Sequence, residues 1–388
     1  MEINIVIKMI ICTVVALCLG FFGFFAAAFS LLMGEFQFYT PLIIVTTIAL
    51  FVFFIMKIFT LAKPRTLKIS SLSFLALCVI ATVIYEIRES YINNIATVSD
   101  QDFNLYGYQP FHEDSSVVAL VEPSNLQLES ELPILDGATA LYPVYSAFAR
   151  ASYPEKEYDV HQSEVMSSQT GEAYRKLIDG VVDIIFAAGP SARQLQMAEE
   201  KGVELELTPI GREAFVFFVN EKNPVKGLTV EQIQAIYSGD ITNWREVGGN
   251  NEAILAFQRP ADSGSQTALE KLMGEEPLVE PPTENIASGM GGIIEEVSSY
   301  RNYKNAIGFT FRFFSTEMVQ NGEVRYLEIN GVYPNKETIR NDEYPITSEF
   351  YAITAGSDNP NIDVFLQWIL SEQGQWLVEE TGYVPINN

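Results

Sequence analysis

The chain has 388 residues, a net charge of −25 and a hydrophobic content of 48%. So acidic a chain is poorly suited to nucleic acid or to anionic lipid head groups, because both would repel it. All three cysteines, Cys12, Cys18 and Cys78, lie in apolar segments near the N-terminus, so we expect no disulfide or thiol chemistry in the rest of the chain.

The first ninety residues hold three long apolar segments. No charged residue occurs from Met9 to Met33, and further apolar runs cover Pro41–Met56 and Ile69–Tyr85. Each run is near the roughly 20 residues that a transmembrane helix needs. The first is too long for the core of a signal peptide and is not followed by a small-residue cleavage site. We predict a membrane segment at 1–88 with transmembrane helices at about 5–33, 41–62 and 69–87.

The loops between these helices differ in basic residues. Residues 34–40 contain none, whereas the connection between the second and third helices is surrounded by Lys57, Lys63, Arg65 and Lys68. Basic loops stay in the cytoplasm. We therefore predict a multi-pass protein of the cell membrane with a cytoplasmic N-terminus and an extracytoplasmic C-terminal domain. Residues 116–388 then carry 18 Lys and Arg against 41 Asp and Glu, a net charge of −23.

A polar, acidic stretch at 89–130 follows the apolar segments and shows no clear periodicity. We predict an extracytoplasmic tether whose later part, Val117–Val121, docks on the next domain. The alternative is a linker without fixed structure throughout.

From residue 131 onwards, short β-rich runs alternate with helical runs. The predicted strands are 132–135, 158–161, 181–187, 204–209, 214–220, 253–257, 306–310 and 349–354. The predicted helices are 140–152, 172–178, 192–201, 230–237 with Thr229 as its cap, 267–273, 291–300, 362–370 and 372–380. Such alternation indicates an α/β fold with mostly parallel sheets.

The sequence offers little for catalysis. Its two histidines, His112 and His161, stand apart, no Cys/His cluster has the spacing of metal ligands, and no hydrolase or nucleotide-binding motif occurs. No base stands near Ser263 to activate it as a nucleophile. We predict that the protein is not an enzyme, with no catalytic residues, no metal site and no cofactor.

A binding site is better supported. The octapeptide Arg259–Gln266 joins a strand to a helix and supplies a guanidinium, two hydroxyls and a glycine. Unpaired backbone N–H groups and the positive end of the helix dipole meet at such a place, which suits tetrahedral oxyanions. Taken alone, a helix cap with a surface arginine is the simpler interpretation. Two other strand-to-helix junctions also carry hydroxyls, namely Thr139 and the turn 167–171, and this favours a shared oxyanion pocket.

In this context the sequence resembles the phosphate-binding proteins that serve phosphate ABC transporters. Several segments carry the resemblance in order: Asp136–Thr139 with Pro143 and Tyr145, Gly180–Ile184, Asn223–Thr229, Ile236–Trp244, Arg259–Ser265, Ala306–Phe309, Tyr344–Ile346, Gly374–Gln375 and Gly382–Pro385. Each is weak singly, but the ordered set spans about two-thirds of the chain. The three N-terminal helices are not part of the family pattern.

The resemblance implies a two-lobed α/β domain of the type II periplasmic-binding-protein fold at 131–388, closing on its ligand by a hinge. Lobe I would cover about 131–220 and 341–388, and lobe II about 221–340. Residue by residue, the ligand contacts that the family implies are Thr139, the backbone of Ala140, Thr170 or alternatively Ser168, Arg259, Ser263, Gly264 and Ser265. The implied ligand is phosphate or a related oxyanion.

One position departs from the family. Its members carry an aspartate after the third strand that accepts the proton of hydrogen phosphate, and Ala188 stands there in this chain. An acceptor-only carboxylate is what separates a protonated oxyanion from sulfate. The identity of the anion is therefore left open by the sequence.

These observations lead to two hypotheses of function. The first is a membrane-tethered solute-binding protein for phosphate or a similar oxyanion, working with an ABC transporter permease. The second is a sensor or scaffold with a degenerate phosphate site that signals to another membrane protein. Nucleic acid is not an expected partner of either.

Overall fold

The computed structural model describes residues 5–34, 36, 38–93, 97–99, 104–259, 261–280, 299–301, 303–313, 316 and 324–386. The described chain divides into two compact units, of which the first contains α1–α3 and the second contains all later elements.

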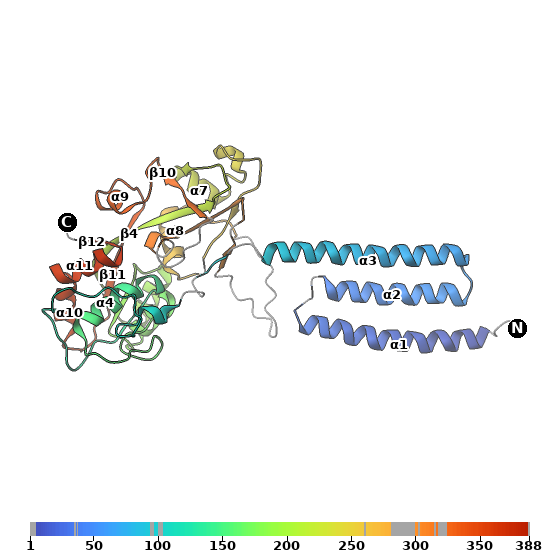
Figure 1. Ribbon diagram of the computed structural model, residues 1–388, viewed down its shortest axis with the longest axis horizontal. Helices are drawn as coiled ribbons and strands as arrows, with labels where there is room; N and C mark the ends of the chain where they lie inside the picture. Colours follow the sequence, from blue (N-terminus) through green and yellow to red (C-terminus); the bar gives the residue numbers. More distant parts are fainter. Residues whose placement is uncertain are drawn as a thin grey trace. The chain divides into compact units, whose positions relative to one another are not determined.

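The first unit consists of the helices α1 (Ile5–Leu32), α2 (Tyr39–Ile58) and α3 (Pro64–Asn93), which lie side by side (Figure 1). All three are long and apolar enough to cross a membrane. Helices α1 and α2 pack closely at Gly23, where an added Cβ would lie 2.6 Å from Thr47 Cγ2. Small residues permit this close approach when no hydrophobic effect drives helices together in lipid.

The second unit is built on an eight-stranded sheet with the order β2-β3-β11-β4-β8-β6, to which β12 and β9 add along β4. The strands are β2 (Leu135–Gly137), β3 (Ile184–Ala188), β4 (Glu206–Asn220), β6 (Leu255–Ala256), β8 (Ala306–Phe311), β9 (Val324–Tyr326), β11 (Thr347–Thr354) and β12 (Val384–Pro385). Two smaller pairs join β1 (Thr97–Ser99) to β7 (Ser299–Arg301) and β5 (Gly227–Leu228) to β10 (Glu328–Ile329).

The expectation of mostly parallel sheets is wrong. Only β2 with β3 and β6 with β8 pair in parallel in the main sheet, and β11, β4 and their other neighbours pair antiparallel. The two runs predicted at 204–209 and 214–220 form one long strand, β4. The sequence hides this continuity because Gly211, Arg212 and Glu213 interrupt the apolar pattern.

Strand β4 connects the two halves of this domain. Its first part, up to Ala214, pairs with β11 and β12, and its second part, from Phe215, pairs with β8 and β9. One hydrophobic cluster, which includes Phe148, Phe186 and Trp368, fills the first half. A second, which includes Phe217, Trp244 and Phe309, fills the other half. Strand β4 therefore crosses the boundary between the two halves, and the predicted residue limits of lobes I and II stay a prediction.

Helices cover the sheet and mostly begin where the sequence indicates. They are α4 (Tyr142–Ser152), α5 (Thr170–Ile178), α6 (Ala192–Lys201), α7 (Val230–Ser238), α8 (Gly264–Met273), α9 (Lys336–Arg340), α10 (Ile362–Ile369) and α11 (Glu372–Thr381), with single turns η1 (Leu105–Tyr108), η2 (Thr139–Leu141) and η3 (Trp244–Val247). Thr229 caps α7 as predicted, since its hydroxyl accepts from Gln232 N in a capping box.

The predicted docking of Val117–Val121 is confirmed, since Val117 is buried in the first cluster and Val118 and Leu120 pack against it; the docked segment begins earlier than predicted, at Leu105. Two other local predictions differ from the structure or lie outside it. Residues 158–161 do not form the predicted strand, because Asp159 Oδ1 accepts from His161 N (2.8 Å) and Gln162 N (2.9 Å) and bends the chain at Val160 and His161. The helix predicted at 291–300 lies largely outside the described residues.

Candidate functional site

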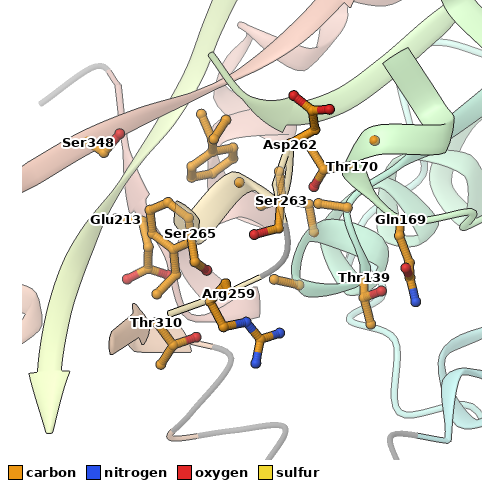
Figure 2. A pocket seen from close by; sticks show the side chains of 18 of the residues that line it. Thr139, Gln169, Thr170, Glu213, Arg259, Asp262, Ser263, Ser265, Thr310 and Ser348 are labelled. Atoms are coloured by element: carbon orange, nitrogen blue, oxygen red, sulfur yellow. The ribbon is translucent and has the colours of Figure 1, made fainter. Parts of the chain in front are cut away.

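A cavity of about 240 Å³ lies where the two halves of the domain meet, beside the crossing strands β4 and β11. The starts of η2, α5 and α8 all reach it (Figure 2). All eight residues that the sequence predicts as ligand contacts line it, namely Thr139, Ala140, Ser168, Thr170, Arg259, Ser263, Gly264 and Ser265. The structure thus brings them together, and their contact with a ligand stays a prediction.

The start of α8 presents hydrogen-bond donors to the cavity. Ser263 is the N-cap, and its hydroxyl oxygen accepts from Gln266 N at 3.2 Å. This bond uses a lone pair of Ser263 and leaves the hydroxyl proton for a ligand. The first N–H groups of α8, at Gly264 and Ser265, have no partner within the helix and add to the positive end of its dipole.

Arg259 supplies a positive charge to the same cavity. Its backbone N donates to Gln266 Oε1 at 2.9 Å, which ties the residue to the first turn of α8. Burial lowers the pKa of the Arg259 guanidinium to about 10, so the group keeps its charge at neutral pH. A charged, planar donor next to helix-end amides is the combination that binds a phosphate-like anion.

The turn before α5 holds the two hydroxyls that the sequence offers as alternatives, Thr170 and Ser168, and the structure gives them different partners. Ser168 donates its hydroxyl proton to Asp136 Oδ2 at 2.6 Å and its backbone N to Asp136 Oδ1 at 2.7 Å. Asp136 is fully buried and forms an ion pair with Lys176 at 3.0 Å. In contrast, Thr170 Oγ1 lies 3.6 Å from the place where a Cβ on Gly264 would stand, so it faces α8 across the cavity. Thr170 is therefore the better donor to an anion.

Two non-glycine residues with positive φ flank the cavity. Gln169 has φ 70° directly before α5, and Asp262 has φ 63° directly before the Ser263 cap. Such conformations are costly for residues with a Cβ and gather at ligand-binding sites. Both loops that present donors are thus held in strained conformations by their surroundings.

Asp262 also connects elements of the two halves. Its Oδ1 accepts from Ser191 Oγ at 2.8 Å, and its backbone O accepts from Gln194 Nε2 at 3.3 Å. Arg193 forms an ion pair with Asp262 Oδ2 at 3.3 Å, although the Arg193 side chain is 72% exposed. These contacts join the start of α6 to the loop before α8, and they hold the cavity walls together.

Ala188, which the sequence places at the position of the family's aspartate, lines the cavity and presents a methyl group 3.5 Å from the position of a Cβ on Gly264. Several other lining residues were not predicted from the sequence. Besides residues of the predicted turn and helix starts, the unpredicted polar residues include Glu213, Thr310, Ser348, Glu349 and Tyr383. One feature of the sequence could have marked Glu213 as a candidate site residue, because it is an acidic residue that directly precedes a long apolar run. The other four lie on crossing or closing segments whose neighbours only the fold defines.

Comparison with known proteins identifies the family. The PBP superfamily domain matches residues 134–373, which is more than half of the chain. The chain belongs to the PBP superfamily. Among curated relatives it is 26% identical to the phosphate-binding protein PstS of Borreliella burgdorferi over 217 residues, covering 54% of this chain and 76% of that protein. It is 27% identical to PstS of Bacillus subtilis over 264 residues, covering 66% of this chain and 80% of that protein.

A solved structure, a putative phosphate ABC transporter substrate-binding protein from Clostridium perfringens with bound phosphate, aligns with a TM-score of 0.48 and 25% identity, covering 65% of this chain and 98% of that chain. The family match and the curated relatives confirm the predicted resemblance and the predicted two-lobed α/β class, here preceded by three apolar helices. The family binds substrates, and among the described residues no group of three or more His, Cys, Asp or Glu side chains could hold a metal.

Proposed function

We propose that this protein is a membrane-tethered, extracytoplasmic receptor that captures phosphate or a similar tetrahedral oxyanion between the two halves of its α/β domain. The observation that carries the proposal is one cavity that combines Arg259, the Ser263 hydroxyl and the starts of α5 and α8. The curated relatives, which are phosphate-binding proteins, support the choice of anion.

Capture needs no covalent step in this proposal. Arg259 supplies the countercharge, while Ser263, Ser265 and Thr170 donate through their hydroxyls and the helix starts donate through their backbone N–H groups. Because these donors come from both halves of the domain, the anion is held best when the halves approach each other. The contacts of Asp262 with Ser191, Arg193 and Gln194 then act as a clasp across the closed cavity.

Titration calorimetry on the full chain in lipid nanodiscs, with inorganic phosphate, tests this function. Arg259→Ala is expected to weaken phosphate binding by about tenfold or more, since a hydrogen bond to a charged group contributes about 1.5–3 kcal/mol. Arg245→Ala, which removes an exposed arginine away from the cavity, is the control and should leave the affinity unchanged. Absence of phosphate binding by the folded wild-type protein would refute the proposal.

Two functions are possible after the anion is captured, namely transport and sensing. We propose delivery to an ABC transporter permease, with the N-terminus in the cytoplasm and the domain outside. The second candidate is a sensor that signals through its helices, and it is favoured by three apolar helices where one would suffice as an anchor. Cross-linking in the native membrane distinguishes the two, because the first requires a permease among the partners and the second requires a signalling membrane protein.

A further inference from the structure

The position at which the relatives' aspartate is expected holds only a methyl group in this chain. Ala188 ends β3, and its methyl lies close to Gly264 across the cavity. A methyl group neither accepts the proton of hydrogen phosphate nor repels a fully deprotonated anion. If the cavity selects its anion, an acidic group elsewhere has to do so.

Glu213 is an acid that lines this cavity from a different element. It lies on β4 at the point where the strand passes from one half of the domain to the other. Figure 2 shows its carboxylate on the same side of the cavity as Ser265 and Thr310. The residue is only 5% exposed, so its carboxylate is shielded from bulk water.

Two backbone bonds fix the Glu213 carboxylate. Its Oε1 accepts from Ala214 N at 3.0 Å and its Oε2 accepts from Phe313 N at 3.2 Å. Each oxygen of an ionised carboxylate has two lone pairs, so one acceptor site remains on each oxygen. These sites suit a ligand that carries a proton.

We propose that Glu213 is the residue that selects a protonated oxyanion over a fully deprotonated one in this cavity, in place of the acid that is absent at Ala188. This inference rests on the proposed oxyanion function and names the residue that makes its site selective. An ionised Glu213 accepts the P–OH proton of hydrogen phosphate, whereas sulfate offers no proton and meets a like charge.

The groups around Glu213 make its selectivity depend on pH. Arg312 after β8 and Lys336 at the start of α9 favour the carboxylate, but burial outweighs them and raises the pKa of Glu213 to about 7. Tyr383 stays neutral, because burial first and the charge of Glu213 in addition hold its pKa well above the usual value. Glu349 on β11 lines the same cavity and is exposed, so it faces solvent.

The protonation state of Glu213 determines whether the cavity excludes or accepts sulfate. Above about pH 7 Glu213 is an acceptor-only carboxylate that excludes sulfate, and below it Glu213 becomes a neutral acid that donates to sulfate. Sulfate itself keeps two charges throughout this range, and Arg259 keeps its positive charge. The other carboxylates that line the cavity, Glu172, Asp262 and Glu349, are ion-paired or exposed. Sulfate affinity should therefore rise on acidification mainly through Glu213.

The experiment measures inorganic phosphate and sulfate binding to the full chain in nanodiscs at about pH 8.5 and about pH 5.5, for the wild type, Glu213→Gln and Glu206→Gln. At the higher pH we expect the wild type to prefer phosphate by about tenfold or more, and Glu213→Gln to lose most of this preference. Glu206→Gln changes an exposed glutamate at the start of the same strand and should behave as the wild type.

The wild type provides a second readout that does not depend on the folding of a variant. Its sulfate affinity should rise by about tenfold between the higher and the lower pH, since the two values lie on either side of the Glu213 pKa. A pH-independent sulfate affinity, or an unchanged anion preference in Glu213→Gln, would overturn the inference and leave the oxyanion function standing. If the wild type binds neither anion, both the function and the inference are wrong.

Discussion

Two hydroxyls on the turn before α5 have different roles in the structure, and substitution separates them. Thr170 faces the start of α8 across the cavity, whereas Ser168 gives its proton to the buried Asp136. We predict that Thr170→Ala weakens phosphate binding by about tenfold to a hundredfold, because a hydrogen bond to a charged group contributes about 1.5–3 kcal/mol. Ser168→Ala should change the affinity by less than about threefold.

Ser168→Ala should instead lower the stability of the domain. Asp136 is fully buried and would keep its bonds to Gly137 N at 2.7 Å and to Lys176 at 3.0 Å, but it would lose the hydroxyl of Ser168. Removing one partner from a buried charged group costs about 1–3 kcal/mol in the free energy of unfolding. Thr170→Ala removes no comparable bond to any of the residues that the structure describes and should have a smaller effect on stability.

Calorimetry gives the affinity of each variant, and urea unfolding followed by tryptophan fluorescence gives the stability. All three tryptophans of the chain, Trp244, Trp368 and Trp376, lie in the α/β domain, so the signal reports on this domain within the full-length protein. The reasoning is refuted if Ser168→Ala loses affinity as strongly as Thr170→Ala while its stability is unchanged.

Three further predictions follow from other contacts. Gln169→Gly should raise the free energy of unfolding by about 1 kcal/mol, because it relieves a strained φ that costs about 1–3 kcal/mol, while the greater freedom of glycine in the unfolded chain offsets part of this stabilisation. The same change at the exposed Gln196 in α6 should lower the free energy of unfolding by about 1 kcal/mol. A lower stability for both variants would contradict the strain at Gln169. Arg193→Ala should speed phosphate release in stopped-flow by no more than about fivefold, because so exposed an ion pair contributes about 0.2–1 kcal/mol. A much larger effect would show that the ion pair between Arg193 and Asp262 contributes more than this to retention of the phosphate. Because the pKa of Glu213 is raised from its ordinary value of 4.5 to about 7, this residue stabilises the ligand-free domain fully below about pH 4.5, and the stabilisation is lost as the pH rises to about 7. Relative to Glu213→Gln, the wild type should therefore lose about 3 kcal/mol over this interval in urea unfolding, and parallel pH profiles would rule this out.

Most helices of the domain could be predicted from the sequence because their caps are local, although the short helix α9 was not predicted. Ser191 and Thr229 each form a capping box with the residue three positions later, and Gly202 and Gly239 end α6 and α7 with positive φ. Strand pairing could not be predicted in the same way. The apolar run of β4 has the same composition whether its neighbours are parallel or antiparallel, and only the returning strand β11 decides.

The residues of the candidate site likewise fall into those that local sequence predicts and those that depend on the fold. Arg259, Ser263 and Ser265 are close in sequence, so a local pattern was enough to group them. The choice between Ser168 and Thr170 depends on Asp136, which is more than thirty residues away and accepts the proton of only one of the two hydroxyls. No spacing rule reveals such a competition, because the acceptor reaches the turn through contacts of β2 with residues 164–166, where Leu135 N donates to Glu164 O at 2.8 Å and Met166 N donates to Leu135 O at 2.9 Å.

The position of Glu213 gives the site a property that an acid at position 188 would not have. Ala188 belongs to β3 and approaches Gly264 of α8 only across the cavity, so a group at 188 depends on how closely the two halves meet. Glu213 lies on β4, which belongs to both halves, and it is held by the N–H groups of Ala214 and Phe313. Its place in the cavity therefore does not depend on closure. In the proposed mechanism, an acid so placed would distinguish anions by their proton when they enter, before the donors of α5 and α8 close on them.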